Sequence, residues 1–114
     1  MNPKILICED DRSISSAVSE YLIAMDYTVL VVNDGDEAIE QFSKFKPDLV
    51  LLDIMMPKMN GLEVIKILRN SYDTPIIFLT AKISLDEKIL GLELGADDYI
   101  TKPFSMRELL LRIK

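Results

Sequence analysis

Five side chains of types that bind metal ions or phosphate stand at the ends of short apolar runs in this sequence. They are Glu9, Asp10, Asp53, Thr80 and Lys102. The arrangement is clearest at Asp53, because consecutive apolar residues precede its carboxylate. In an open sheet of parallel strands, ligands bind beyond the carboxyl ends of the strands. If the apolar runs are such strands, we expect these side chains to meet in one crevice.

Each of these residues also has a purely structural explanation. Acids that follow a strand often cap the next helix, and we expect that role for Asp11. Asp53 could open a turn, Thr80 could simply end a strand, and Lys102 could be a solvated surface charge. Single matches of this kind are hypotheses. Their joint position at strand ends favours a shared site.

The three carboxylates of Glu9, Asp10 and Asp53 would repel one another in a shared crevice. At a separation of ~6 Å and an effective dielectric constant of about 20, each pair costs about 3 kcal/mol. Positive charge must offset this cost, and the candidates are Lys102 and a bound cation. An oxygen-only site with room for water suits Mg²⁺. A carboxylate beside Mg²⁺ and an ammonium group, with the Thr80 hydroxyl as a donor, can accept a phosphoryl group.

The apolar runs alternate with segments of helical periodicity. Each run is short and rich in β-branched residues or leucine, which is typical of strands buried on both faces. Between the runs, apolar residues recur at helical spacing, and Ile89, Leu90 and Leu94 indicate the fourth such helix. The pattern predicts one α/β domain over residues 1–114, with a mostly parallel sheet and helices on both faces. Strands are expected at residues 4–8, 28–32, 48–52, 75–79 and 98–101.

Composition narrows the function classes. The chain has 114 residues, 49% of them hydrophobic, and a net charge of −6. This acidic balance argues against nucleic-acid binding by the domain itself. The sequence has no histidine, which excludes histidine-based acid–base catalysis and histidine metal ligands. Apolar runs far shorter than about 20 residues argue against a membrane span. The single cysteine, Cys8, reads as a core side chain and fits a cytoplasmic location.

Four motifs together resemble the receiver domain of two-component response regulators, and the resemblance covers essentially the whole chain. They are "ILICEDD" (residues 5–11), "DLVLLDIMMPKMNGLEV" (48–64), "PIIFLTA" (75–81) and "GADDYITKPF" (95–104). The resemblance implies a flavodoxin-like (βα)₅ fold, doubly wound, with strand order 2-1-3-4-5. It further implies that Asp53 is the phosphoacceptor and takes a phosphoryl group from a histidine on a partner kinase.

The same resemblance assigns the Mg²⁺ ligands. Asp10 and Asp53 would bind the ion directly, Glu9 through water, and Met55 through its backbone carbonyl. The first acid of the motif is Glu9 where many members of the family have aspartate.

The resemblance also assigns the residues that respond to the phosphoryl group. Lys102 would pair with one phosphoryl oxygen, and Thr80 would donate a hydrogen bond to another. Tyr99 would be an aromatic switch that turns inward once Thr80 moves. The Lys102–Pro103 peptide bond would be cis.

The motif "GADDYITKPF" looks most like the OmpR/PhoB branch, whose receivers precede a winged-helix DNA-binding domain. That branch forms homodimers through helix 4, strand 5 and helix 5. Matching positions here would form the intersubunit ion pairs Lys88–Glu108 and Asp98–Arg112; as solvated surface charges they would contribute only ~0–1 kcal/mol each. Because the sequence stops at Lys114, about two turns into the last helix, we expect a fragment whose DNA-binding domain is absent.

Two further hypotheses concern regulation. Glycine costs about 1 kcal/mol relative to alanine inside a helix, so Gly91 suggests a marginal fourth helix whose population phosphorylation can shift. Met55 and Lys82 each follow a site residue by two positions, where the family tunes how water reaches the acyl phosphate. An apolar Met55 cannot orient that water, which predicts a long-lived phosphorylated state.

Two rival functions stay open at this stage. An aspartate-nucleophile phosphatase would need a D-x-D motif after the first strand, whereas the acceptor here follows the third and continues Ile54-Met55. A binding module of the same fold could signal without phosphate, although the complete set of site residues disfavours it. The expected activity is a slowly self-dephosphorylating phosphoacceptor and not a turnover enzyme.

Overall fold

The computed structural model describes residues 2–81 and 84–113 of the chain. Within these residues, strands and helices alternate along the sequence. The strands are β1 (Lys4–Cys8), β2 (Thr28–Val32), β3 (Leu49–Asp53), β4 (Ile76–Thr80) and β5 (Asp98–Thr101). The helices are α1 (Arg12–Ala24), α2 (Gly35–Phe45), α3 (Gly61–Leu68), α4 (Leu85–Glu93) and α5 (Met106–Ile113).

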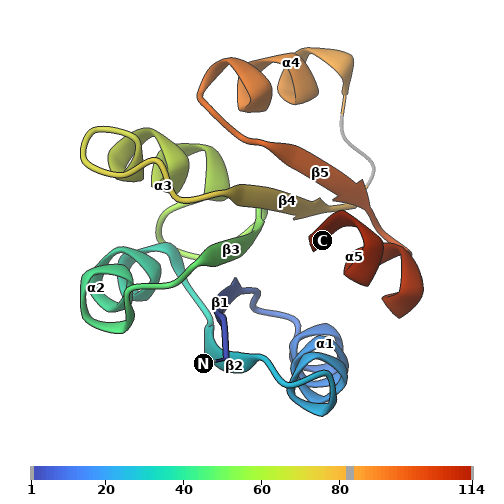
Figure 1. Cartoon of the computed structure of the whole chain (residues 1–114). Coiled ribbons are helices and arrows are strands. Elements are labelled where there is room, and N and C mark those ends of the chain that lie inside the picture. The colour runs from blue at the N-terminus through green and yellow to red at the C-terminus, as the bar shows by residue number, and fades with distance from the viewer. Residues whose placement is uncertain (1, 82–83, 114) are drawn as a thin grey trace.

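The strands form one parallel sheet in the order β2-β1-β3-β4-β5, as the resemblance implied. Helices α1 and α5 cover one face, and α2, α3 and α4 cover the other (Figure 1). The chain runs from β1 outward to β2 and then returns past β1 to β3. This reversal of direction places the ends of β1 and β3 side by side, where doubly wound sheets bind ligands.

Two apolar layers hold the helices on the sheet. Alternate residues of each central strand face opposite layers, so Leu6 and Ile7 of β1 belong to different ones. Val64 and Ile65 of α3 complete the layer on the α2–α3 side. Cys8 lies in that same layer, fully buried, and burial raises the pKa of its thiol well above its usual range. The expectation of a core cysteine is therefore confirmed.

Two of the expected strands, at residues 48–52 and 75–79, were placed one residue too early at both ends. β3 ends at Asp53 and β4 at Thr80, each a position later than the apolar runs indicated. The backbone ladder continues through these polar residues, since Asp53 is in register with Leu79 and Thr80 with Thr101. The side chain decides which residues look like a strand in the sequence, but the backbone hydrogen bonds decide where the strand ends.

Gly91 is the buried residue of helix α4. Ile89 and Leu90, expected on its buried stripe, are each 44% exposed. The helix instead turns Gly91 toward the sheet, where an added Cβ would lie 2.9 Å from the Phe78 ring. The close approach of the helix to this ring leaves its larger apolar side chains outward. Among residues 2–81 and 84–113, no helix is long and apolar enough to cross a membrane.

Candidate functional site

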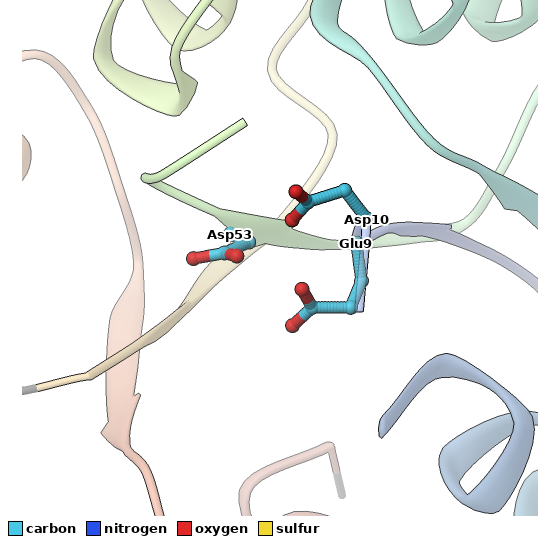
Figure 2. Close-up of side chains that lie close together, drawn as sticks. All are labelled: Glu9, Asp10 and Asp53. Carbon is cyan, nitrogen blue, oxygen red and sulfur yellow. The ribbon is translucent and has the colours of Figure 1, made fainter. Parts of the chain in front are cut away.

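The carboxylates of Glu9, Asp10 and Asp53 converge at the carboxyl edge of the sheet. One oxygen from each lies within 4.8 Å of the others, and Figure 2 shows the three groups pointing into a common space. Asp53 is the last residue of β3, whereas Glu9 and Asp10 follow β1 directly. The sequence prediction that these acids share one crevice is confirmed.

The three acids differ in exposure, and this difference shapes their electrostatics. Glu9 is fully buried and Asp53 is 4% exposed, while Asp10 lies open to solvent. Burial, helped by the neighbouring Asp53, raises the pKa of Glu9 to about 7 against the opposing effect of its hydrogen bond from Lys102. The trio therefore carries crowded negative charge with one group poised near neutral pH.

Lys102 lies between the two buried carboxylates. Its Nζ donates to Glu9 Oε1 and lies 3.3 Å from Asp53 Oδ2. Burial lowers the pKa of Lys102, but the Glu9 hydrogen bond and the Asp53 charge outweigh burial, so the net direction is upward. Lys102 therefore remains a cation that offsets part of the repulsion. Its bond to Pro103 is cis, as the resemblance implied.

Thr80 is the last residue of β4, at the same edge of the sheet as the cluster. Its hydroxyl group is unusual. Its side chain is fully buried, and Oγ1 has no hydrogen-bond partner in the part of the chain that the structure describes. Buried hydroxyls are normally paired, because an unpaired one costs about 1–3 kcal/mol. An orphaned donor at the edge of an acidic cluster suits a ligand that brings its own oxygen acceptors.

Tyr99 of β5 is half-buried and packs against the α2–α3 layer of the core. Lys88 of α4 places its Nζ 4.5 Å from the centroid of the Tyr99 ring. A cation at this distance is attracted by the face of an aromatic ring. The residue expected to act as a switch thus has a direct contact with α4.

Met55 lies in the segment that leaves β3. Its backbone N–H donates to Asp53 Oδ1 over 3.2 Å, and its side chain is 68% exposed. The expected regulatory position at Lys82 lies outside the described residues. Asp11 caps α1 by accepting hydrogen bonds from Ser13 N and Ile14 N, which confirms the structural role expected for it.

The residues expected on a dimer face lie on α4, β5 and α5. Arg112 pairs with Asp98 of its own chain, with Nη1 and Oδ2 3.1 Å apart. Lys88 is directed at Tyr99, and Glu108 lies in the first turn of α5. The intersubunit pairing of these groups stays a prediction.

Sequence reasoning missed a groove that adjoins Lys102. It has a volume of about 390 Å³ and runs between the first turns of α1 and the segment that leads into α5. Its lining is Ser13, Ile14, Ala17, Lys102, Pro103, Phe104 and Met106. No sequence signal marked it, because its two walls are separated by most of the chain and each reads as an ordinary helix start.

The parallel fold and the acidic cluster at its carboxyl edge agree with a comparison of the sequence with known families. A sequence model of the response regulator receiver domain matches residues 5–114. The chain therefore belongs to the response regulator receiver domain family, the phosphorelay domains of two-component systems.

Individual relatives place the chain more narrowly. Transcriptional regulatory protein CpxR of Escherichia coli strain K12 is 48% identical over 111 residues, which is 97% of this chain and 47% of that protein. CpxR of Klebsiella pneumoniae is 49% identical over the same shares. The chain thus spans about half the length of these curated relatives.

Solved structures agree closely with this fold. The BeF3-activated N-terminal receiver domain of RstA from Klebsiella pneumoniae superposes with a TM-score of 0.92 and 42% identity, over 96% of this chain and 94% of that one. The receiver domain of the Francisella response regulator 1452 gives 0.92 and 39%, over 98% and 93%. CpxR and RstA are regulators of the OmpR/PhoB family, the branch that the "GADDYITKPF" motif indicated.

Proposed function

We propose that this domain accepts a phosphoryl group on Asp53 from a histidine kinase, with Mg²⁺ bound beside it. One observation carries the proposal: Asp53 lies within 4.8 Å of Glu9 and Asp10 while Lys102 reaches both buried carboxylates. Few structural roles call for three acids and one lysine at a single strand edge.

The donor set fits a hard divalent cation. All three candidate side chains offer carboxylate oxygens. The Asp10 side chain is exposed to solvent, which leaves room for water ligands. Asp10 and Asp53 would hold Mg²⁺ with the Met55 carbonyl, and Glu9 would bind through water. When bound, the ion supplies positive charge that neutralises the carboxylates and the oxygens of an arriving phosphoryl group.

The chain's own residues would carry the transfer. An oxygen of Asp53 forms the bond to phosphorus as the bond to the kinase imidazole breaks. Lys102 already contacts Asp53 and would move to a phosphoryl oxygen as negative charge arrives there. Thr80 would donate its orphaned hydroxyl to another oxygen. The contact of Lys102 with Asp53 and the unpaired hydroxyl of Thr80 thus support this role of Asp53.

Phosphorylation would then be transmitted to the face formed by α4, β5 and α5. Movement of Thr80 toward the phosphoryl group vacates space for Tyr99, which would leave its contact with Lys88. The freed Lys88 would pair with Glu108 of a second copy, and Asp98 with Arg112. The outcome proposed for the full-length regulator is a homodimer that controls transcription through a winged-helix domain beyond the receiver.

The rival enzyme function is less well supported. A phosphatase must expose its acyl phosphate to an activated water, yet no histidine is available as a base. Asp53 is nearly buried, and Met55 beside it is apolar. We therefore propose a slowly self-dephosphorylating phosphoacceptor that does not turn over small phosphate esters.

Intact mass spectrometry tests the acceptor directly. The protein is incubated with acetyl phosphate, with Mg²⁺ or with a chelator, as wild type and as Asp53→Asn. We expect the mass of one phosphoryl group only for wild type with Mg²⁺. A phosphoryl group gained by Asp53→Asn, or gained equally with the chelator, would contradict the proposal. Multiple turnover of small phosphate esters would favour the phosphatase instead.

A further inference from the structure

The segment of residues 54–60, between Asp53 and α3, supports the acceptor carboxylate. The Met55 N–H donates to Asp53 Oδ1, so the position of this segment aims the Asp53 side chain. The segment is anchored at its far end as well, because the Gly61 N–H donates to the Ile54 carbonyl over 2.8 Å. A displacement of this segment would therefore move the Asp53 carboxylate.

The first turn of α2 packs directly on the same segment. Gly35 is buried, and its N–H lies 3.5 Å from the Pro57 carbonyl oxygen. A Cβ at Gly35 would lie 2.2 Å from the Met59 carbonyl oxygen and 2.5 Å from the Met59 Cβ. Real Cβ atoms do not approach backbone so closely, so any larger residue must push residues 54–60 away. Space, and not backbone conformation, requires glycine at this position.

Asp34 ties the same two segments together through its side chain. One carboxylate oxygen accepts the Glu37 N–H over 2.8 Å and caps α2. The other lies 3.6 Å from Lys58 Nζ, in the segment that follows Asp53. Lys58 has a positive φ of 68°, a conformation that non-glycine residues seldom adopt unless neighbouring contacts hold them.

From these contacts we infer that Gly35 and Asp34 are positioning residues for the phosphoacceptor site, although they touch none of its proposed reacting groups. They hold residues 54–60 against α2, and the Met55 N–H passes that position on to the Asp53 carboxylate. The inference rests on the proposed function of Asp53. The β2–α2 connection contributes no acid to the cluster. By this inference it nevertheless helps to set the Mg²⁺ affinity and the phosphorylation rate of the site.

Gly35→Ala tests this inference with Gly91→Ala as its matched control. Both are buried helical glycines, but the control's Cβ meets the side chains of Phe78 and Leu62 and not the backbone of Met59. The free energy of unfolding, the Mg²⁺ dissociation constant and the rate of phosphorylation by acetyl phosphate are measured under conditions where each variant is folded. We expect Gly35→Ala to weaken Mg²⁺ binding or slow phosphorylation by about 10- to 100-fold. Gly91→Ala should change the Mg²⁺ dissociation constant by less than about twofold, whatever its stability.

Asp34→Asn provides a second test if Gly35→Ala does not fold. Asparagine keeps the cap on α2 but removes the charge that faces Lys58. Asp36→Asn is the control, because it removes one negative charge two residues further along the chain. The Asp36 side chain is exposed and forms no ion pair among residues 2–81 and 84–113. We expect Asp34→Asn to weaken Mg²⁺ binding by about two- to fivefold. Asp36→Asn should change it by less than that, because exposed distant charges are screened.

The outcomes separate this inference from the proposed function. If wild type gains no Mg²⁺-dependent phosphoryl group, the proposed function fails. If wild type is phosphorylated and Gly35→Ala matches it in Mg²⁺ affinity and rate, the positioning role is overturned while the function stands. Equal effects of Asp34→Asn and Asp36→Asn would overturn the role of Asp34, because charge alone would then explain them.

Discussion

Arg112 of α5 pairs with Asp98 of β5 within one chain, over 3.1 Å. The proposed dimer uses the same two residues between subunits, so its formation must exchange an internal ion pair for an external one. The side chains are 48% and 31% exposed, and such pairs contribute only ~0–1 kcal/mol. The proposed exchange would therefore cost little free energy.

Single charge reversals should reveal the intersubunit pairing. Asp98→Arg and Arg112→Asp chains each bring like charges together across a two-fold interface, so each phosphorylated variant alone should stay monomeric. Mixed together, they restore opposite charges at both contacts and should form heterodimers. Sedimentation velocity of the separate and mixed phosphorylated proteins measures this. If mixing produces no more dimer than either variant alone, the two residues do not pair between subunits.

The orphaned hydroxyl of Thr80 predicts a gain in stability on its removal. Thr80→Val replaces a buried, unpaired hydroxyl by a methyl group of similar size, which should raise the free energy of unfolding by about 1 kcal/mol. The same variant should lose phosphorylation-dependent dimerisation, because valine cannot donate to the phosphoryl group. Urea denaturation measures the first effect and sedimentation the second.

Thr101→Val is the matched control for this experiment. Thr101 is the register neighbour of Thr80 on β5 but is exposed to solvent. Its replacement should change stability by no more than about 0.5 kcal/mol. A clear loss of stability in Thr80→Val would show that the hydroxyl is paired in the unphosphorylated protein.

The raised pKa of Glu9 predicts pH-dependent Mg²⁺ binding. With its pKa raised to about 7, mainly by burial, Glu9 is largely protonated at pH 6 in the metal-free protein. Metal binding requires the carboxylate form, so affinity should fall below neutral pH, by up to about tenfold per pH unit. Calorimetric titration with Mg²⁺ at pH 6, 7 and 8 measures the trend. Glu9→Gln should flatten it, and an equally steep dependence in that variant would assign the proton to another group.

The raised pKa of Glu9 also makes the folding stability depend on pH. A carboxyl whose folded pKa lies above its ordinary value of 4.5 adds stability that is fully present below that value. This stability is lost as the pH rises through about 7. Mg²⁺ should therefore stabilise the protein more at pH 8 than at pH 6, as thermal denaturation with and without the ion can show.

The exposed, apolar side chain of Met55 predicts slow decay of the phosphorylated state. Met55→Asn would place a polar group that can orient an attacking water beside Asp53, and we expect the acyl phosphate to decay about tenfold faster. Met25→Asn, the same replacement at an exposed position after α1, is the control. Loss of the phosphoryl mass over time measures the decay. An unchanged decay rate in Met55→Asn would remove this role.

The strands and the acids at their ends could be predicted because their signals are local, whereas the strand order came from the resemblance to the receiver family. A strand buried on both faces must be continuously apolar, so a single Asp53 at its end marks where the chain reaches the edge. Parallel topology then brings Glu9 and Asp53 together, since β1 and β3 are neighbours. Burial of a strand on both faces thus determines both its apolar sequence and the place where its first polar residue lies.

The features that could not be predicted depend on contacts between distant segments. The sequence predicted a helix-weakening role for Gly91, and the structure adds a packing reason, because an added Cβ would lie 2.9 Å from the Phe78 ring. The hypothesis of a marginal α4 remains a prediction for amide exchange, which should be faster there than in α3. Likewise, no local sequence pattern indicates that Lys102 donates a hydrogen bond to Glu9 or that Met59 packs against Gly35.

A crystal structure with Mg²⁺ and beryllium fluoride, a mimic of the phosphoryl group, tests the convergence of these residues most directly. We predict the fluoroberyllate on an oxygen of Asp53, contacts to it from Lys102 and Thr80, and a cation held by Asp10 and Asp53. Density for the fluoroberyllate at any other residue, or a cation that shares no ligand with Asp53, would contradict the account.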